Sequence, residues 1–337
     1  PLKLIIDLMK LIQLLLLLLP FNFFSQSDDS FILGMGSCLD QDTDQQEIWS
    51  SLEKEKLTEF FFLGDNIYGD TKDGSLENMQ SAYDKQSSNF PDWLNDVTVN
   101  AIWDDHDYGI NDGGGDYKSK AEAQELFLDF WKIKESDRRS NDEGIYFSKD
   151  AIFNNKVIKI IGLDTRYFRS PLEGGKRTRT PTQDTTKTML GSNQWSWLEN
   201  QLSQNMDILI LASSVQVIAT NNGFEKWGNF PHERQKLFEM LTKLKKPVVM
   251  LSGDRHKAGL YKMGDLYEIT SSSMNKPLPK WLSLYWDSTQ KETDEFLVGE
   301  MFYEPNYGIL KIEDGNNIEL ELKNKEGESL NKITITF

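Results

Sequence analysis

The sequence predicts an α/β (α+β) fold, and two observations support this. Apolar runs of strand length alternate with amphipathic stretches of helix length along most of the chain. Polar side chains follow several of these runs directly, as at the carboxyl ends of strands in an open α/β sheet. With 337 residues, the chain is long enough to form a large hydrophobic core.

Residues 60–63 give the clearest example of this pattern, because the run Phe-Phe-Phe-Leu predicts a buried strand that ends at a glycine. Asp65, Tyr68 and Asp70 follow that strand. Their carboxylate and phenol oxygens are donors that a hard metal ion prefers. The alternative is an Asp-rich turn that closes a buried strand.

The remaining elements follow from the same patterns. Strands are predicted at residues 31–38, 97–103, 157–163, 208–211, 248–251, 266–270, 308–312, 318–322 and 333–337, and the chain from Ala258 on is expected to be mostly strand-like. Helices are predicted around residues 48–52, 75–86, 121–134, 194–202 and 232–244. Two loops are expected near a site: a glycine-rich one at 111–115 and a long one at 170–193.

The composition narrows the classes of partner and of metal site. There are 53 acidic and 37 basic residues, a net charge of −16, so neither nucleic acid nor an anionic membrane surface is expected as a main partner. Cys38 is the single cysteine, which excludes an intrachain disulfide. With three histidines, a metal centre must draw mostly on carboxylates.

Residues 1–27 are predicted to be a signal peptide. Two lysines precede or border the apolar run 11–19, and Ser25-Gln26-Ser27 provides a small-x-small cleavage site. The run is shorter than the roughly 20 residues of a bilayer span. We therefore expect the mature domain, 28–337, to be periplasmic or extracellular, without a stable membrane span. An uncleaved membrane anchor is the alternative.

The segment Asp104-Asp105-His106-Asp107 is the strongest local signal for chemistry. Carboxylates placed around one imidazole repel one another at neutral pH unless a cation offsets them. This predicts Asp105 as a metal ligand, His106 as a proton-transfer group and Asp107 as the residue that holds the imidazole ring. The alternative is a solvated acidic turn.

Three other strand ends carry candidate residues. Cys38 is either a buried small apolar residue or a thiolate ligand. Arg166 either clamps a phosphate group or pairs with an acidic neighbour. Asp254 and His256, two residues apart in extended chain, point the same way and suit a shared metal centre.

Five motifs together resemble the PhoD-like alkaline phosphatases, a branch of the calcineurin-like metallophosphoesterases. In chain order they are Gly36-Ser37-Cys38, Gly64-Asp65-Asn66-Ile67-Tyr68, Trp103-Asp104-Asp105-His106-Asp107, Leu163-Asp164-Thr165-Arg166 and Gly253-Asp254-Arg255-His256. The resemblance extends from about residue 31 to the end of the chain. It implies a four-layer α/β/β/α sandwich with its site on one edge.

The resemblance also implies a reaction and a set of roles. Family members bind iron (Fe³⁺) and calcium (Ca²⁺) and hydrolyse phosphate esters through in-line attack of a metal-bound hydroxide. By position, Cys38, Asp65 and Tyr68 resemble metal ligands, with Asp65 as the bridge. Asp105 and Asp254 resemble ligands of the calcium side, and His256 resembles the closing histidine of the iron side. His106 resembles the general acid that protonates the leaving oxygen, and Arg166 the residue that holds the phosphoryl oxygens.

Four interpretations of the function remain open at this point. The first is an exported alkaline phosphatase or phosphodiesterase, monomeric, acting on a small-molecule or lipid phosphoester. The second is a phospholipase-type phosphodiesterase of the same fold. The third is a non-catalytic calcium-binding protein, and a cysteine hydrolase based on Cys38 is a more distant alternative.

Overall fold

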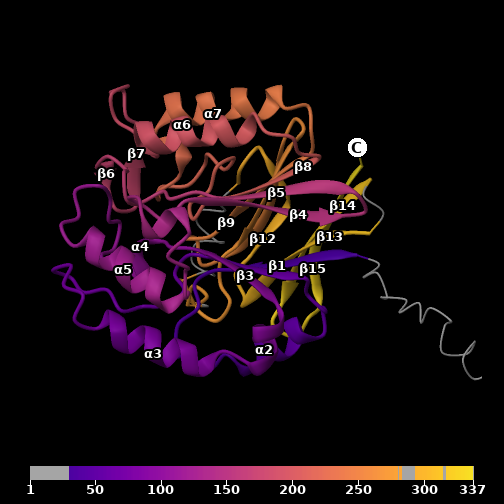
Figure 1. Cartoon of the computed structure of the whole chain (residues 1–337), viewed down its shortest axis with the longest axis horizontal. Helices are drawn as coiled ribbons and strands as arrows, with labels where there is room; N and C mark the ends of the chain where they lie inside the picture. Colours follow the sequence, from indigo (N-terminus) through magenta and orange to yellow (C-terminus); the bar gives the residue numbers. More distant parts are fainter. Residues whose placement is uncertain (1–29, 280, 283–292, 314–315, 337) are drawn as a thin grey trace, which may run out of the picture.

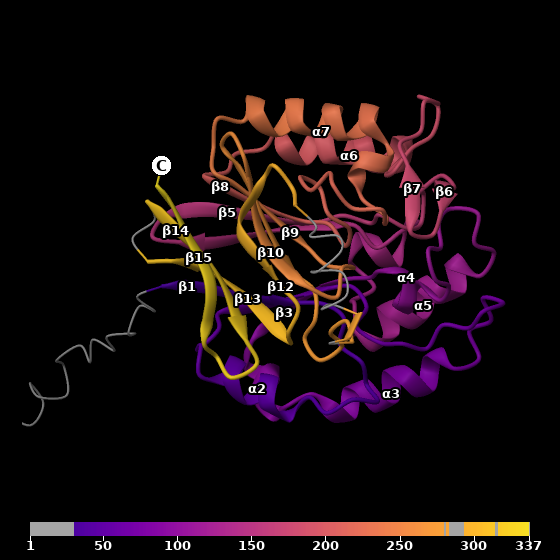
Figure 2. The same ribbon diagram turned by 180° about the vertical axis from the view of Figure 1, so that it is seen from behind.

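Two β-sheets form the centre of the molecule, and helices cover the outer face of each (Figure 1). This computed structural model describes residues 30–279, 281–282, 293–313 and 316–336, so the predicted signal peptide lies outside the described residues. The order of layers is helix, sheet, sheet, helix (Figure 2). The predicted α/β fold and its four-layer sandwich are confirmed.

The first sheet has the strand order β15-β14-β13-β1-β2-β3. In that order, its strands are Ser329–Thr336, Asn317–Asn324, Asn306–Ile312, Phe31–Gly36, Glu59–Leu63 and Thr98–Ile102. The second sheet has the order β12-β10-β11-β9-β8-β5-β4. Its strands are Leu297–Phe302, Ala258–Met263, Leu266–Ser271, Val248–Ser252, Ile208–Ala212, Lys156–Gly162 and Phe147–Phe153.

The helices form the two outer layers. The first sheet is covered by α2 (Gln46–Glu53), α3 (Met79–Asn89) and α5 (Lys120–Phe130), and the second by α6 (Gly191–Leu202) and α7 (Pro231–Lys243). A single turn, α4, spans Asp105–Tyr108, and 3₁₀ turns lie at Asp92–Asp96, Arg138–Ser140 and Trp227–Asn229. No helix in the described part of the chain is long and apolar enough to cross a membrane.

The apolar strands are buried on both faces, which explains their continuous hydrophobic runs. In β8, Ile208 and Ile210 belong to the core between the sheets, whereas Leu209 and Leu211 pack into the core under α6 and α7. Side chains alternate between the two faces of a strand, so a buried strand needs apolar residues at every position. Each fully buried side chain of this size contributes about 1.5–3 kcal/mol.

Strand direction places the predicted site residues at one edge. β1, β2 and β3 run parallel in one sheet, and β5, β8, β9 and β11 run parallel in the other. The segments that follow β1, β2, β3, β5 and β9 are those that carry the five sequence motifs. The carboxyl ends of parallel strands meet at one sheet edge, where α/β proteins bind their ligands.

Several elements were not predicted. The strand β4 was missed because Lys149 and Asp150 interrupt its apolar run, as suits an edge strand that is exposed on one face. β10 and β12 lie within the region predicted only as generally strand-like. The long loop contains a small hairpin of β6 (Glu173–Gly175) and β7 (Thr178–Thr180).

Candidate metal centre

The strand ends that carry the predicted ligands share an uncommon backbone conformation. Cys38, Asp65, Asp254 and His256 have positive φ angles of 55°, 52°, 67° and 51°. Such a conformation costs a residue with a side chain about 1–3 kcal/mol and is concentrated at functional sites. The prediction that Asp254 and His256 lie in extended chain is therefore wrong. Both residues nevertheless line the same cavity.

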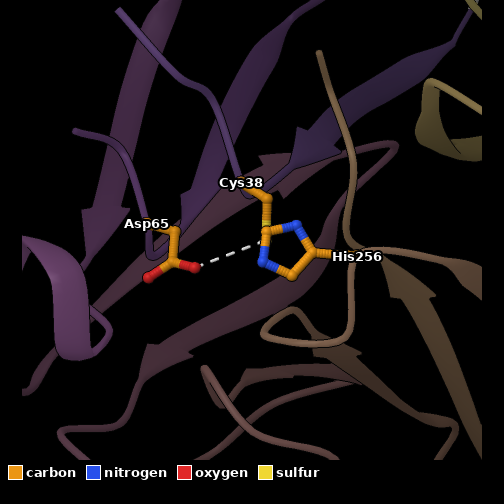
Figure 3. A group of neighbouring side chains, drawn as sticks. All are labelled: Cys38, Asp65 and His256. Carbon is orange, nitrogen blue, oxygen red and sulfur yellow. Dashed lines mark hydrogen bonds between the residues drawn. The ribbon is translucent and has the colours of Figure 1, made fainter. Parts of the chain in front are cut away.

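The first group of candidate ligands combines three kinds of donor, as Figure 3 shows. One ligand atom each from Cys38, Asp65 and His256 lies within 4.8 Å of the others, and Cys38 Sγ is 3.4 Å from Asp65 Oδ2. His256 Nδ1 donates a hydrogen bond to the carbonyl oxygen of Lys276 at 2.6 Å, which leaves Nε2 as the ring's acceptor. The Tyr68 hydroxyl donates to Asp65 Oδ2 at 3.2 Å, so the structure brings these four predicted residues together.

The second group consists of carboxylates. Ligand atoms of Asp104, Asp105 and Asp254 lie within 4.8 Å of one another, and Asp105 also groups with Asp112 and Glu225. A further group contains Asp65, Asp105 and His106. Asp65 thus belongs to the mixed-donor group and also to a group with Asp105, and so links the two halves of the site.

These groups fit bound cations. The oxygens Asp65 Oδ1 and Asp104 Oδ2 are buried and have no hydrogen-bond partner within the described ranges. Burial raises the pKa of Asp65, Asp104 and Asp254 above their ordinary values, and the neighbouring carboxylates raise it further. A thiolate, an imidazole and a carboxylate suit a transition metal, whereas the carboxylate group suits calcium.

The partner of His106 differs from the prediction. His106 Nδ1 donates to Asp70 Oδ1 at 2.6 Å, so Asp70, not Asp107, holds the ring and leaves Nε2 for the cavity side. Burial lowers the pKa of His106, but the carboxylates of Asp105, Asp65 and Asp70 outweigh it and raise this pKa well above its usual value.

Asp107 has a structural role instead. Its buried carboxylate accepts hydrogen bonds from the backbone amides of Asp65 and Asn66 at 3.2 Å each, from the Asn66 side chain and from the Asp104 amide. Gly64 makes this joint possible, because with its φ of +100° a Cβ there would lie 2.5 Å from the Asp104 Cβ. Asp107 therefore ties together the loops after β2 and β3.

Arg166 is also placed differently from the phosphate clamp implied by the family resemblance. Its side chain is 0% exposed and is not among the residues that line the cavity. Its Nε donates to Asp104 Oδ1 and its NH1 to Glu225 Oε1, at 2.7 Å each. The acidic pairing, which the sequence left open as the alternative, is the observed one. Arg166 supports the carboxylate group from behind.

A cavity of about 340 Å³ opens above these residues. Asp65, Asp105, His106, Asp254 and His256 line it. The other lining residues were not predicted to have a role in the site: Asn111, Asp112, Lys176, Arg177, Phe224, Glu225, Arg255 and Leu278. Asn111 and Asp112 belong to the predicted glycine-rich loop, which is held in place because Asp105 Oδ2 accepts from the Asn111 side chain and the Asp112 amide. Glu225 had no sequence signal, because it lies in an irregular segment between two elements.

The geometry agrees with a comparison of sequences. The sequence profile of the PhoD-like phosphatases matches residues 33–301. The chain belongs to this family. Membership implies a phosphoester hydrolase, and the fold with its acidic and histidine clusters is that of a metallophosphoesterase. A search of curated proteins gave no match.

Solved structures show the same fold at low identity. The structure of PhoD is 16% identical with a TM-score of 0.66, and the match covers 91% of this chain and 68% of that one. GAP50, the anchor in the inner membrane complex of Plasmodium, is 12% identical with a TM-score of 0.61 over 91% and 89% of the two chains. The purple acid phosphatase PPD1 from yellow lupin seeds is 13% identical with a TM-score of 0.60, over 91% of this chain and 54% of the lupin enzyme.

Proposed function

We propose that this PhoD-like protein is an exported, metal-dependent phosphoesterase that hydrolyses phosphate monoesters and diesters. The observation that carries the proposal is the position of Asp65, which joins a mixed-donor group and a carboxylate group on the floor of one cavity. Two cations held side by side are the arrangement used for displacement at phosphorus. Export is supported by the sequence of residues 1–27 alone.

The donors suggest which metals the two halves would hold. Cys38, Asp65, Tyr68 and His256 suit Fe³⁺, because thiolate, phenolate and imidazole favour a transition metal. Asp105 and Asp254, with Asp104 behind them, suit Ca²⁺. When bound, such ions supply a hydroxide nucleophile from water and neutralise charge on the phosphoryl oxygens.

His106 has the geometry of a general acid. Its Nδ1 is occupied by Asp70, so Nε2 is the nitrogen that can hold a proton on the cavity side. As the bond between phosphorus and the leaving oxygen breaks, Nε2 would donate its proton to that oxygen, and the alcohol would leave neutral. Asp70 orients the ring and stabilises its charged form.

Two alternatives are weaker. A phospholipase-type phosphodiesterase would use the same floor and differ only in its substrate. A non-catalytic calcium-binding protein, which would resemble GAP50 in its anchor role, would not require a proton donor. The His106–Asp70 pair beside the carboxylates therefore favours an enzyme.

The test is hydrolysis of 4-nitrophenyl phosphate and bis(4-nitrophenyl) phosphate by the mature chain at alkaline pH with calcium and iron supplied. We expect turnover of at least one ester and its loss on chelation, and the ratio of the two rates ranks monoesterase against diesterase activity. A folded, metal-loaded chain that hydrolyses neither ester would contradict the proposal and favour the binding protein or a narrower lipid phosphodiesterase.

A further inference from the structure

The cavity has an acidic floor and a basic rim. The rim is the tip of the β6–β7 hairpin, where Lys176 and Arg177 form the two-residue turn between the strands. Both residues line the same cavity as Asp65 and His106. Two adjacent cations therefore face an acidic site in a chain whose net charge is −16. Such a local positive charge attracts an anionic group of a ligand.

The hairpin is fixed to the loops that surround the floor. The backbone amide of Arg179 donates to the carbonyl oxygen of Gly223 at 2.8 Å. The Arg179 guanidinium forms an ion pair with Asp112, which is itself hydrogen-bonded through its amide to Asp105. The position of the tip is therefore coupled to that of the candidate ligand Asp105.

The approach of the neighbouring loop to the tip is unusually close. A Cβ at Gly223 would lie 2.2 Å from the carbonyl oxygen of Arg177, so this contact requires a residue without a side chain. Phe224, the next residue, contributes an apolar wall to the cavity beside the tip.

The base of the hairpin is anchored as well. Glu173 accepts hydrogen bonds from Thr182 Oγ1 at 2.6 Å and from Lys187 Nζ at 2.9 Å. The Thr182 amide donates to the carbonyl oxygen of Asn229, just before α7. Held at base and tip, the hairpin can present its turn at a defined place over the cavity.

Neither cation of the hairpin tip forms an ion pair with another described residue. Within the part of the chain that the structure describes, neither Lys176 nor Arg177 has a carboxylate oxygen within 4.0 Å, whereas Arg179 in the same hairpin is paired with Asp112. The reacting phosphoryl group belongs on the floor, beside Asp65 and His106. The tip is thus available to a different part of the substrate.

We propose that Lys176 and Arg177 recognise a second anionic group, a carboxylate or a second phosphate, on a small organic phosphoester. This inference rests on the proposed function and specifies its substrate class. A paired ammonium and guanidinium form charge-assisted hydrogen bonds with such anions, and the guanidinium does so bidentately. Phe224 and Leu278 would contact the apolar part of the molecule that joins the two anions.

The test compares three esters that differ only in the second group: glycerol 3-phosphate, 3-phosphoglycerate and glycerol 1,3-bisphosphate. The first has no second anion, the second carries a carboxylate and the third a second phosphate. Release of inorganic phosphate gives kcat/KM for each. We expect the native chain to prefer at least one of the two esters that carry a second anionic group by about tenfold or more over glycerol 3-phosphate. Which of the two is preferred identifies the second group.

The variant Lys176→Ser/Arg177→Ser should reduce that preference to below about threefold and leave the rate with glycerol 3-phosphate nearly unchanged. The matched control is Lys245→Ser/Lys246→Ser, which removes the same charge at the opposite end of β9 and should keep the preference. No preference in the native chain, or a preference that survives in the hairpin variant, would overturn the proposal.

A binding measurement separates this proposal from the proposed function. If the metal-loaded native chain hydrolyses neither these three esters nor the two 4-nitrophenyl esters, the proposed function fails. Calorimetric titration with propylphosphonate and 3-phosphonopropionate, which differ by one carboxylate, then tests whether the hairpin tip binds a second anionic group. Tighter binding of 3-phosphonopropionate that is lost in Lys176→Ser/Arg177→Ser supports it, and equal binding of the two phosphonates overturns it.

Discussion

The two halves of the candidate metal centre differ in how their charge is balanced. In the carboxylate half, Arg166 lies behind Asp104 and already provides a buried positive charge. In the mixed-donor half, the groups that contact His256 and Cys38 are neutral: the Lys276 carbonyl holds His256, and the Ser272 hydroxyl lies 3.2 Å from Cys38 Sγ. In the carboxylate half, the protein therefore compensates part of the negative charge. In the mixed-donor half, the kinds of donor atom would determine which metal binds.

This difference leads to distinct expectations for the two halves. A cation in the carboxylate half competes with Arg166 for the charge of Asp104, so its affinity should depend on how that arginine is placed. A cation in the mixed-donor half should be chosen by thiolate, imidazole and carboxylate together. Asp65 is the residue through which a change in one half would reach the other.

The largest effect is expected for Asp65→Asn, which alters both halves at once. Turnover of 4-nitrophenyl phosphate should fall by at least about 10³-fold, more than the 10–100-fold typical of residues that only orient a ligand. Metal content should fall in parallel, while circular dichroism shows that the fold persists. A folded Asp65→Asn chain with near-normal turnover would break the account of a shared ligand.

Next comes Arg166→Met, which disturbs the carboxylate half alone. Loss of the guanidinium leaves Asp104 and Glu225 buried without their cation, so the free energy of unfolding should fall by about 3–5 kcal/mol. Denaturant unfolding measures this. Arg177→Met is the matched control, since its exposed side chain should change stability by less than about 0.5 kcal/mol. If the two variants were equally stable and Arg166→Met had a raised KM, we would conclude that Arg166 binds the phosphoryl oxygens of the substrate.

A smaller effect is expected for His106→Ala, and it should leave both metal sites filled. Hydrolysis of an alkyl phosphate, whose leaving oxygen needs a proton, should slow by about 10²-fold. Hydrolysis of 4-nitrophenyl phosphate, whose leaving group departs as an anion, should slow much less. If metal content falls instead and both esters slow equally, His106 is a ligand and not a general acid.

The smallest effect is expected for Cys38→Ser, which tests the mixed-donor half. A hydroxyl is a poorer ligand than a thiolate for a transition metal, so iron content should fall while calcium content stays, and turnover should drop by about tenfold. Elemental analysis of native and variant chains measures both metals. A matched loss of calcium would show that the two halves are not distinct.

The part of the site that could be predicted from the sequence consists of residues in short contiguous motifs. Cys38, Asp65, Asp105, Asp254 and His256 each follow a recognisable apolar strand, and parallel strands bring such ends together. The four-layer fold followed from the same strands once their motifs were compared with a known family.

Other parts of the site depend on contacts that the sequence does not encode locally. Asp107 is adjacent to His106 in sequence, but the short helix α4 turns its carboxylate toward the backbone of Asp65, and Asp70 reaches the imidazole from the loop after β2. Glu225 lies in an irregular segment, and the hairpin tip joins two strands of only three residues each, too short to give a periodic pattern. Their positions follow from long-range packing.

The most direct test of the central claim is a metal titration of the apo chain, followed by hydrolysis of 4-nitrophenyl phosphate and bis(4-nitrophenyl) phosphate. We expect no turnover in the metal-free chain and a return of activity as two cations bind per chain, with iron and calcium together more effective than either alone. Full activity in a chain shown by elemental analysis to be metal-free would contradict that claim.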